Sequence, residues 1–170
     1  MKLSTVRPLT RDHVLDGFDC GSPAQSGWLT RHALQAHASG TSRVYVVEDL
    51  VSESVVGYYA LAAGSIGRAD APRRLQRGAG GYDQPVILLT RLGVDLRAQG
   101  AGLGRRLLAD ALRRVEATAD LVGVRALLIH CENEKARGFY RRQARFETSP
   151  TDPLHLLLLI KDLRAALNTR

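Results

Sequence analysis

Residues 99–104 read QGAGLG and stand between an apolar run at 86–94 and a long amphipathic run that follows. The apolar run predicts a buried strand, and the amphipathic run predicts a helix. A helix begins with backbone N–H groups that no carbonyl of the helix accepts, and its dipole is positive at that end. Glycine lets a backbone approach a phosphate without an intervening Cβ. Residues 99–104, here called the phosphate loop, therefore predict a site for a phosphate-bearing ligand.

The residue order in the phosphate loop excludes two common nucleotide-binding motifs. A P-loop ends in Gly-Lys-Ser/Thr, whereas here Gly104 is followed by Arg105 and Arg106. The dinucleotide fingerprint needs a small third residue, and counted from Gly100 and Gly102 that position is Arg105. A tight turn that uses glycine for its geometry alone remains the alternative.

What remains is the order Gln-x-x-Gly-x-Gly, formed by Gln99, Gly102 and Gly104. It resembles the pyrophosphate loop of the GNAT superfamily of N-acetyltransferases, which bind acetyl-coenzyme A. A second match follows a strand-like run at 126–129, where the family carries Asn and then Ala-x-x-Phe-Tyr on a helix. The matching residues are Asn133, Ala136, Phe139 and Tyr140. The family's usual Gly-Phe is replaced by Arg145-Phe146, and the match covers about residues 85–147.

The resemblance implies a role for each matched segment. The strand at 86–94 splays from its parallel neighbour, and its free backbone groups pair with the pantetheine arm and align the thioester. Tyr140 protonates the leaving thiolate, with direct transfer and no covalent enzyme intermediate; a core aromatic is the alternative. Phe139 then faces the core while Tyr140 faces the cofactor cleft. The implied cofactor-binding residues are Leu92, Gly93, Val94, Gln99, Gly100, Gly102, Leu103, Gly104, Arg105 and Asn133.

Other residues near these motifs have plainer interpretations. Asn133 is as well explained as a helix N-cap as by a hydrogen bond to pantetheine. Glu132 and Glu134 are the carboxylates available as a base, and both are interpreted as structural or solvated. Cys20 and Cys131 are interpreted as packed thiols, and the sequence shows no metal cluster.

A second resemblance lies in the N-terminal half. Phe18-Asp19-Cys20-Gly21-Ser22 followed by Trp28-Leu29 is similar to the opening of a GNAT subgroup, the acetyltransferase toxins of bacterial toxin–antitoxin modules. This resemblance implies acetylation of the α-amino group of aminoacyl-tRNA, a ribbon-helix-helix antitoxin as partner, and a homodimer. A loop that caps the helix beginning near Pro23 is the structural alternative.

The charge of the chain agrees with a polyanionic acceptor. The formal net charge is +7, and most of the basic residues are arginines, which pair bidentately with phosphate. Ordinary solvated faces are the alternative. The arginines expected to bind the acceptor are Arg73, Arg74, Arg77, Arg141 and Arg142.

Length and hydropathy predict one domain over residues 1–170, of α/β class with a mixed central sheet flanked by helices. No membrane partner is expected, because no long apolar run and no signal core occur, and two cysteines fit the reducing cytoplasm. Strands are expected at 3–8, 44–47, 55–61, 86–94, 124–131 and 154–160. Helices are expected at 22–40, 103–119 and 133–142 and in the tail, with Gly123 near a helix end and a loop over 67–84.

Three function classes remain open at this point. The first is a toxin that acetylates aminoacyl-tRNA. The second is a general N-acetyltransferase for a small-molecule or protein amine. The third is a non-catalytic module that binds acyl-CoA or nucleic acid.

Overall fold

The computed structural model describes residues 1–169, which fall into two compact units. Unit 1 comprises Met1–Ala62 and Thr90–Ala111, and unit 2 comprises Ala63–Leu89 and the chain from Leu112 onward. The single domain expected over residues 1–170 stays a prediction.

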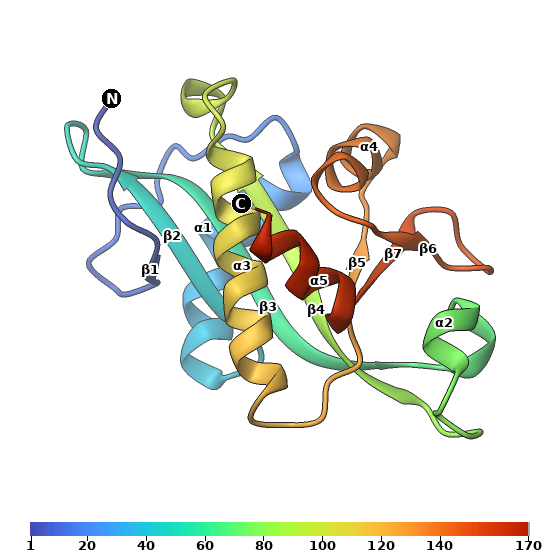
Figure 1. The fold of residues 1–170 in the computed structure, drawn as a ribbon. Helices are drawn as coiled ribbons and strands as arrows, with labels where there is room; N and C mark the ends of the chain where they lie inside the picture. Colours follow the sequence, from blue (N-terminus) through green and yellow to red (C-terminus); the bar gives the residue numbers. More distant parts are fainter. Residues whose placement is uncertain (170) are drawn as a thin grey trace. The chain divides into compact units, whose positions relative to one another are not determined.

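Seven strands form a mixed sheet in the order β1-β2-β3-β4-β5-β7-β6 (Figure 1). The strands are β1 (Arg7–Pro8), β2 (Arg43–Asp49), β3 (Ser54–Ile66), β4 (Gln84–Val94), β5 (Ala126–His130), β6 (Glu147–Thr148) and β7 (His155–Leu159). The helices are α1 (Pro23–Ser39), α2 (Arg73–Gln76), α3 (Leu103–Ala119), α4 (Glu134–Gln143) and α5 (Ile160–Asn168), with 3-10 turns η1 (Arg68–Asp70) and η2 (Leu96–Ala98). The expected α/β class with a mixed sheet is confirmed.

Unit 1 is built on the antiparallel hairpin of β2 and β3. Its register runs from Arg43 opposite Leu61 to Asp49 opposite Ser54. Its core lies between this hairpin and α1 and includes Phe18, Leu29 and Tyr58. Helix α1 begins and ends as its sequence predicts. Ser22 accepts the Gln25 amide as N-cap, proline occupies the first helical turn, and Gly40 ends the helix in the left-handed conformation.

Unit 2 contains the parallel pair of β4 and β5 and the antiparallel pairs of β5 with β7 and of β7 with β6. The parallel register runs from Val86–Ala126 to Leu89–Ile129, and β4 continues beyond it to Val94. A separate apolar core packs beneath α2 and includes Ile66, Leu75, Leu128 and Leu157.

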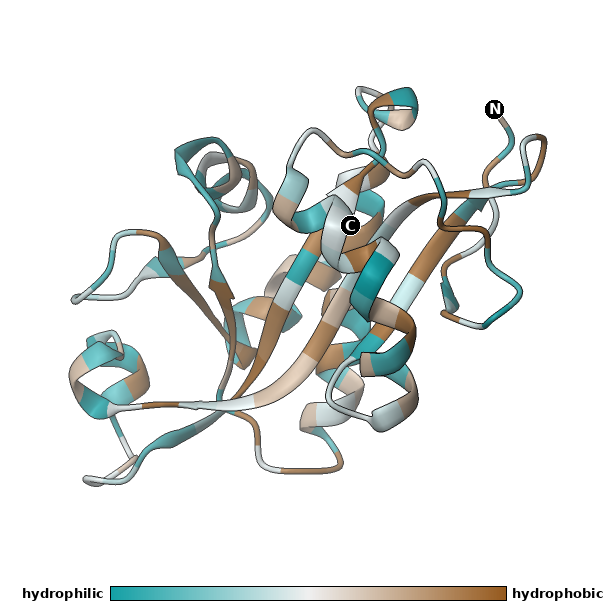
Figure 2. Cartoon of the chain, turned by 180° about the vertical axis from the view of Figure 1, so that it is seen from behind, coloured by the Kyte–Doolittle hydropathy of each residue, from teal (hydrophilic) through white to brown (hydrophobic). Residues whose placement is uncertain are grey.

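Helix α3 confirms the periodicity that predicted it. Every residue of its apolar stripe is buried, at 3% exposure or less. The stripe consists of Leu103, Leu107, Leu108, Ala111, Leu112 and Val115. Figure 2 shows long hydrophobic stretches along the central strands. Burial of each leucine stabilises the fold by about 1.5–3 kcal/mol. No helix within the described residues has the length and apolar character needed to span a membrane.

Several expected boundaries were wrong. The segment 67–84 is not one loop, because η1 and α2 form within it. Strand β3 continues to Ile66, and the short edge strand β6 was not expected. Gly123 does not end a helix, since α3 stops at Ala119 and a turn follows. Edge strands of two residues carry too little hydrophobic pattern to be recognised from sequence.

Candidate active site

The phosphate loop follows η2 and leads directly into α3. Gly100 and Gly102 have φ values of 85° and 84°, in the left-handed region that favours glycine. A Cβ built on either residue meets no described heavy atom within 4 Å, so both positions border open space. Leu103 is buried, and the Gly102 carbonyl accepts the Arg106 amide at 3.1 Å to close the first helical turn. An open backbone at a helix N-terminus fits a pyrophosphate.

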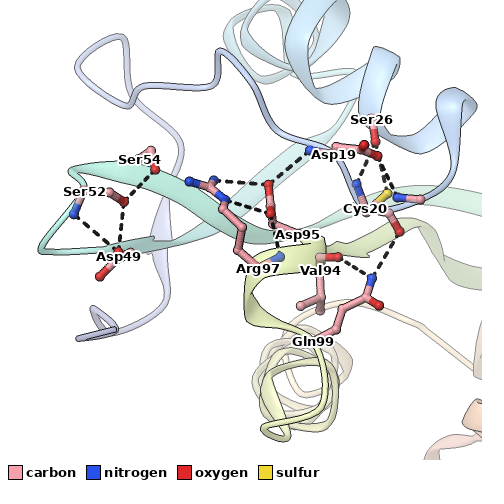
Figure 3. Close-up of polar contacts among 11 residues, drawn as sticks. Asp19, Cys20, Ser26, Asp49, Ser52, Ser54, Val94, Asp95, Arg97 and Gln99 are labelled. Carbon is pink, nitrogen blue, oxygen red and sulfur yellow. Dashed lines mark hydrogen bonds and ion pairs between the residues drawn. The ribbon is translucent and has the colours of Figure 1, made fainter.

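Gln99 hydrogen-bonds to the backbone of unit 1. Its Nε2 donates to the Val94 carbonyl at 2.9 Å and to the Cys20 carbonyl at 3.2 Å (Figure 3). These two contacts join the phosphate loop both to the end of β4 and to residues 18–22, here called the N-terminal turn. The geometry therefore supports a positioning role for Gln99, and its expected contact with the cofactor stays a prediction.

Asp95 fastens η2, the turn that precedes the loop, to the N-terminal turn, and it is the residue that sequence reasoning missed. The residue is 2% exposed, and its carboxylate accepts the Asp19 amide at 3.1 Å and the Arg97 amide and Nε at 2.9 Å each (Figure 3). Burial opposes ionisation, but the hydrogen bonds from Arg97 and Asp19 outweigh it and lower the pKa of Asp95. An aspartate directly after a buried strand and before a turn was the available signal.

The N-terminal turn caps α1 and also contacts η2. Ser22 caps α1, as the structural alternative proposed. The Asp19 carbonyl also accepts the Leu96 amide at 2.8 Å, so the turn is fastened to η2 and through it to the phosphate loop. The N-terminal turn, although distant in sequence, thus helps to position η2 and the phosphate loop, which is the predicted cofactor site.

Gly93 lies where β4 packs closely on the N-terminal turn. A Cβ at this position would lie 3.1 Å from Cε1 of Tyr58 and 3.3 Å from Sγ of Cys20. This contact explains why glycine occupies the centre of the segment expected to align the thioester. Its neighbours Leu92 and Val94 are half-buried.

Tyr140 lies on α4 in unit 2 and is almost fully buried, at 7% exposure. Its ring packs edge-on against Phe139 and Phe146, with centroid separations of 5.1 and 6.1 Å. Burial, with a smaller contribution from Cys131, raises the pKa of the phenol, so it stays protonated at neutral pH. Phe139 is only half-buried, so the expectation that it is the core-facing member of the pair was wrong.

Asn133, Cys131 and Glu134 have structural roles in unit 2. The Asn133 Oδ1 accepts the Ala136 amide at 2.9 Å, so the residue is the N-cap of α4. Burial raises the pKa of the Cys131 thiol to about 11, which agrees with a packed thiol and not a nucleophile. Glu134 is exposed and lies 3.7 Å from Arg137. Contact of Asn133 with the cofactor stays a prediction.

The arginines expected to bind the acceptor differ in their surroundings. Arg73, Arg77, Arg141 and Arg142 are exposed, as is Arg105 in the first turn of α3. Arg74 is half-buried and pairs with Asp162 at 2.6 Å and with Glu147 at 3.2 Å. Its guanidinium is engaged inside unit 2, so the structure does not place Arg74 with the exposed group.

The described part of the chain contains no group of three or more His, Cys, Asp or Glu residues suited to a metal ion.

Known proteins resemble this chain in sequence and in fold. The family model described as an acetyltransferase (GNAT) domain matches residues 40–143. A tRNA-acetylating toxin of Mycobacterium tuberculosis (strain ATCC 25618 / H37Rv) is 48% identical over 95% of both chains. AtaT complexed with acetyl-methionyl-tRNAfMet has a TM-score of 0.87 and 30% identity, covering 96% of this chain and 98% of that one.

A further solved structure is a mutant AtaT toxin bound to the C-terminus of the antitoxin AtaR and acetyl-CoA. It has a TM-score of 0.81 and 28% identity, and covers 99% of both chains. The match of the family model over more than half of the sequence, together with the 48% identity, shows the family. This chain belongs to the GNAT acetyltransferases.

Proposed function

We propose that this protein transfers the acetyl group of acetyl-CoA to the α-amino group of aminoacyl-tRNA and thereby blocks translation as the toxin of a toxin–antitoxin module. The observation that carries the proposal is the open, left-handed glycine backbone of the phosphate loop at the start of α3. The similarity to the tRNA-acetylating toxin of M. tuberculosis and to AtaT in complex with acetyl-methionyl-tRNAfMet supports the acceptor.

Acetyl-CoA enters as co-substrate and supplies the activated acetyl thioester. The amides of Gly100, Gly102, Leu103 and Gly104 bind its pyrophosphate, with the positive end of the α3 dipole behind them. The backbone at Leu92–Val94 aligns the pantetheine arm. Gln99 holds the Val94 carbonyl, and so fixes the end of the strand against which the arm pairs.

The chemistry is a direct acyl transfer. The deprotonated amine attacks the thioester carbonyl, a C–N bond forms, and the C–S bond breaks to leave the CoA thiolate. Tyr140 gives its proton to that thiolate, and the proton that the acylated nitrogen loses returns to the phenolate through solvent. An unassisted phenol ionises near pH 10, so burial that raises its pKa keeps the proton in place until the thiolate forms.

The acceptor is a polyanion, and the net charge of +7 attracts it over long range. Arg73, Arg77, Arg141 and Arg142 contact its phosphates, since their side chains are exposed. Arg74 stabilises unit 2 instead.

The neutralising partner is a small ribbon-helix-helix antitoxin, and the protein acts in the cytoplasm as a homodimer. The mutant AtaT structure with the C-terminus of the antitoxin AtaR supports an antitoxin partner.

The test is transfer of labelled acetyl from acetyl-CoA to purified charged tRNA. Uncharged tRNA and charged tRNA with a blocked α-amine are the controls, and neither should accept label. Polyamines and a lysine-containing peptide test the general N-acetyltransferase. If the small amines are acetylated efficiently while charged tRNA is not, the toxin function is wrong; if acetyl-CoA binds without any transfer, the non-catalytic module is the better description.

A further inference from the structure

Arg91 of β4 is held in place by an aromatic stack in unit 1. Its guanidinium carbon lies 5.5 Å from the ring centroid of Trp28, which projects from α1. The Trp28 ring also stacks on Tyr58, with an interplanar angle of 12° and a centroid separation of 6.1 Å. A planar guanidinium over an indole face is attracted by the ring quadrupole and loses side-chain freedom. Arg91 is therefore ordered without a carboxylate partner.

This setting distinguishes Arg91 from other arginines in the chain. Arg74, Arg97 and Arg164 are paired with carboxylates at 2.6 to 2.9 Å. Within residues 1–169 the Arg91 guanidinium has no ion pair and no hydrogen bond. A half-buried arginine in this state keeps its charge and its N–H donors for an external anion.

The position of Arg91 along β4 indicates which anion that is, on the basis of the function proposed above. The pantetheine arm starts at the phosphate loop and runs back along β4, so the thioester lies near Leu92, and Arg91 is the next residue in that direction. Side chains alternate along a strand, and Gly93 and Arg91 both face the side that carries Tyr58 and Trp28. In the proposed function, Arg91 is therefore the residue next to the thioester on the side of β4 that carries Trp28.

We propose that Arg91, oriented by Trp28, binds the phosphate that joins the 3′-terminal nucleotide of charged tRNA to the rest of the acceptor end. That phosphate is the anion of the tRNA nearest to the esterified amino acid. A guanidinium contacts it through two parallel N–H···O bonds, which fix orientation as well as charge. Arg91 is a positioning residue in this proposal, because it holds the acceptor and takes no part in proton transfer.

The experiment compares two minimal acceptors. In both, the amino acid is esterified to the ribose of adenosine, and only one of them also carries a 5′-phosphate. Arg91→Gln should raise KM for the phosphate-bearing ester by about 10- to 100-fold, the value of a charged hydrogen-bonded pair. It should leave KM for the adenosine ester, kcat and the Kd for acetyl-CoA unchanged. Arg91→Lys and Trp28→Leu should give smaller increases that depend on the phosphate in the same way. Arg31→Gln, an exposed arginine of α1, is the matched control and should change neither KM.

Each other outcome has a defined meaning. An equal rise of KM for both esters would overturn the assignment, because Arg91 would then act on the aminoacyl group or on the fold. A weaker affinity for acetyl-CoA would overturn it as well, since the anion would be that of the cofactor. If Arg91→Gln lowers the unfolding temperature, the two esters are compared with Arg91→Lys instead. If Arg91→Lys then raises KM equally for both esters or for neither, the contact with the phosphate is refuted. Failure of the wild type to acetylate any charged tRNA would instead refute the proposed function.

Discussion

The phosphate loop and Tyr140, each in its own unit, are held in place by opposite kinds of interaction. The loop depends on polar contacts in which Asp95 and Gln99 satisfy backbone groups of neighbouring turns. Tyr140 depends on aromatic packing against Phe139 and Phe146. Polar contacts fix a backbone while leaving its outward amides available, whereas apolar packing keeps a phenol neutral. The loop should therefore be sensitive to polar changes beside it, and Tyr140 chiefly to the loss of its own hydroxyl.

The largest effect is expected from Tyr140→Phe. The ring packing is retained, so the unfolding temperature and acetyl-CoA affinity should change little, while turnover on charged tRNA falls by about 10²–10⁴-fold, as for loss of a general acid. Because the pKa of Tyr140 is raised, its ionisation should cause no loss of turnover below pH 10. Steady-state kinetics across pH on folded protein test both statements.

The control for that experiment is Tyr82→Phe, which removes a hydroxyl from a tyrosine that is 83% exposed. It should leave turnover unchanged. In cells, expression of the wild type without antitoxin should arrest growth, and Tyr140→Phe should not. Near-normal turnover of Tyr140→Phe would make Tyr140 a packing residue and place the acid elsewhere.

The next largest effect tests the loop side of the comparison. Gly102→Asp places a carboxylate where the phosphate meets backbone amides, and should weaken acetyl-CoA binding by at least about 100-fold. Gly102→Ala imposes the same left-handed strain without the charge, so it separates backbone strain from repulsion. Calorimetry on folded variants measures both. Equal affinity in the Asp variant and the wild type would mean that this loop does not bind the phosphate.

The sequence predicted the loop and α3 well because both depend on local patterns. Glycines at 100 and 102 are needed wherever the backbone takes a positive φ, and the apolar stripe of α3 repeats at helical spacing. Capping of α1 by Ser22 was predicted for the same reason. The sequence could not predict the hydrogen bond from the Asp19 amide to the Asp95 carboxylate, because those residues are far apart along the chain and their contact depends on the fold. The burial of Tyr140 relative to Phe139 likewise depends on the neighbour Phe146, outside the helix itself.

The arginines of the α2 region show the same limit. Arg73, Arg74 and Arg77 are close in sequence and were expected to share one role, yet only Arg73 and Arg77 are exposed. A double variant, Arg73→Ala with Arg77→Ala, should lower kcat/KM on charged tRNA by about 10-fold and reduce its salt dependence, since fewer counterions are released on binding. Acetyl-CoA affinity and stability should stay as in the wild type.

Arg74→Ala is the contrasting variant. It leaves Asp162 and Glu147 without their guanidinium, so it should lower the unfolding temperature and leave the salt dependence of tRNA acetylation intact. Activity assays over a salt series, combined with thermal unfolding, distinguish the two variants. A salt slope that falls with Arg74→Ala and not with the double variant would reverse the assignment of these residues.

The smallest effect on activity is expected from Asp95→Asn, which weakens the polar support of the loop without touching a residue that faces the cofactor. The amide retains the shape of the carboxylate but removes its charge and turns one acceptor into a donor, facing Arg97 and the Asp19 amide. The free energy of unfolding should fall by about 1–3 kcal/mol at neutral pH. Acetyl-CoA affinity should fall only a few-fold, because the glycines keep their conformation.

The pH dependence of this last variant identifies the cause. The folded-state pKa of Asp95 is lowered, so its carboxylate stabilises the fold above the unfolded-state pKa of about 3.9, and this contribution is lost as pH falls through the folded-state value. The difference in unfolding free energy between wild type and Asp95→Asn should therefore shrink below about pH 4. Urea denaturation from pH 7 down to pH 3 measures it, with the exposed Asp12→Asn as control. A difference that stays constant over this range would mean that Asp95 supports the loop by shape alone, and the contrast between a polar loop and an apolar acid would then lose its electrostatic basis.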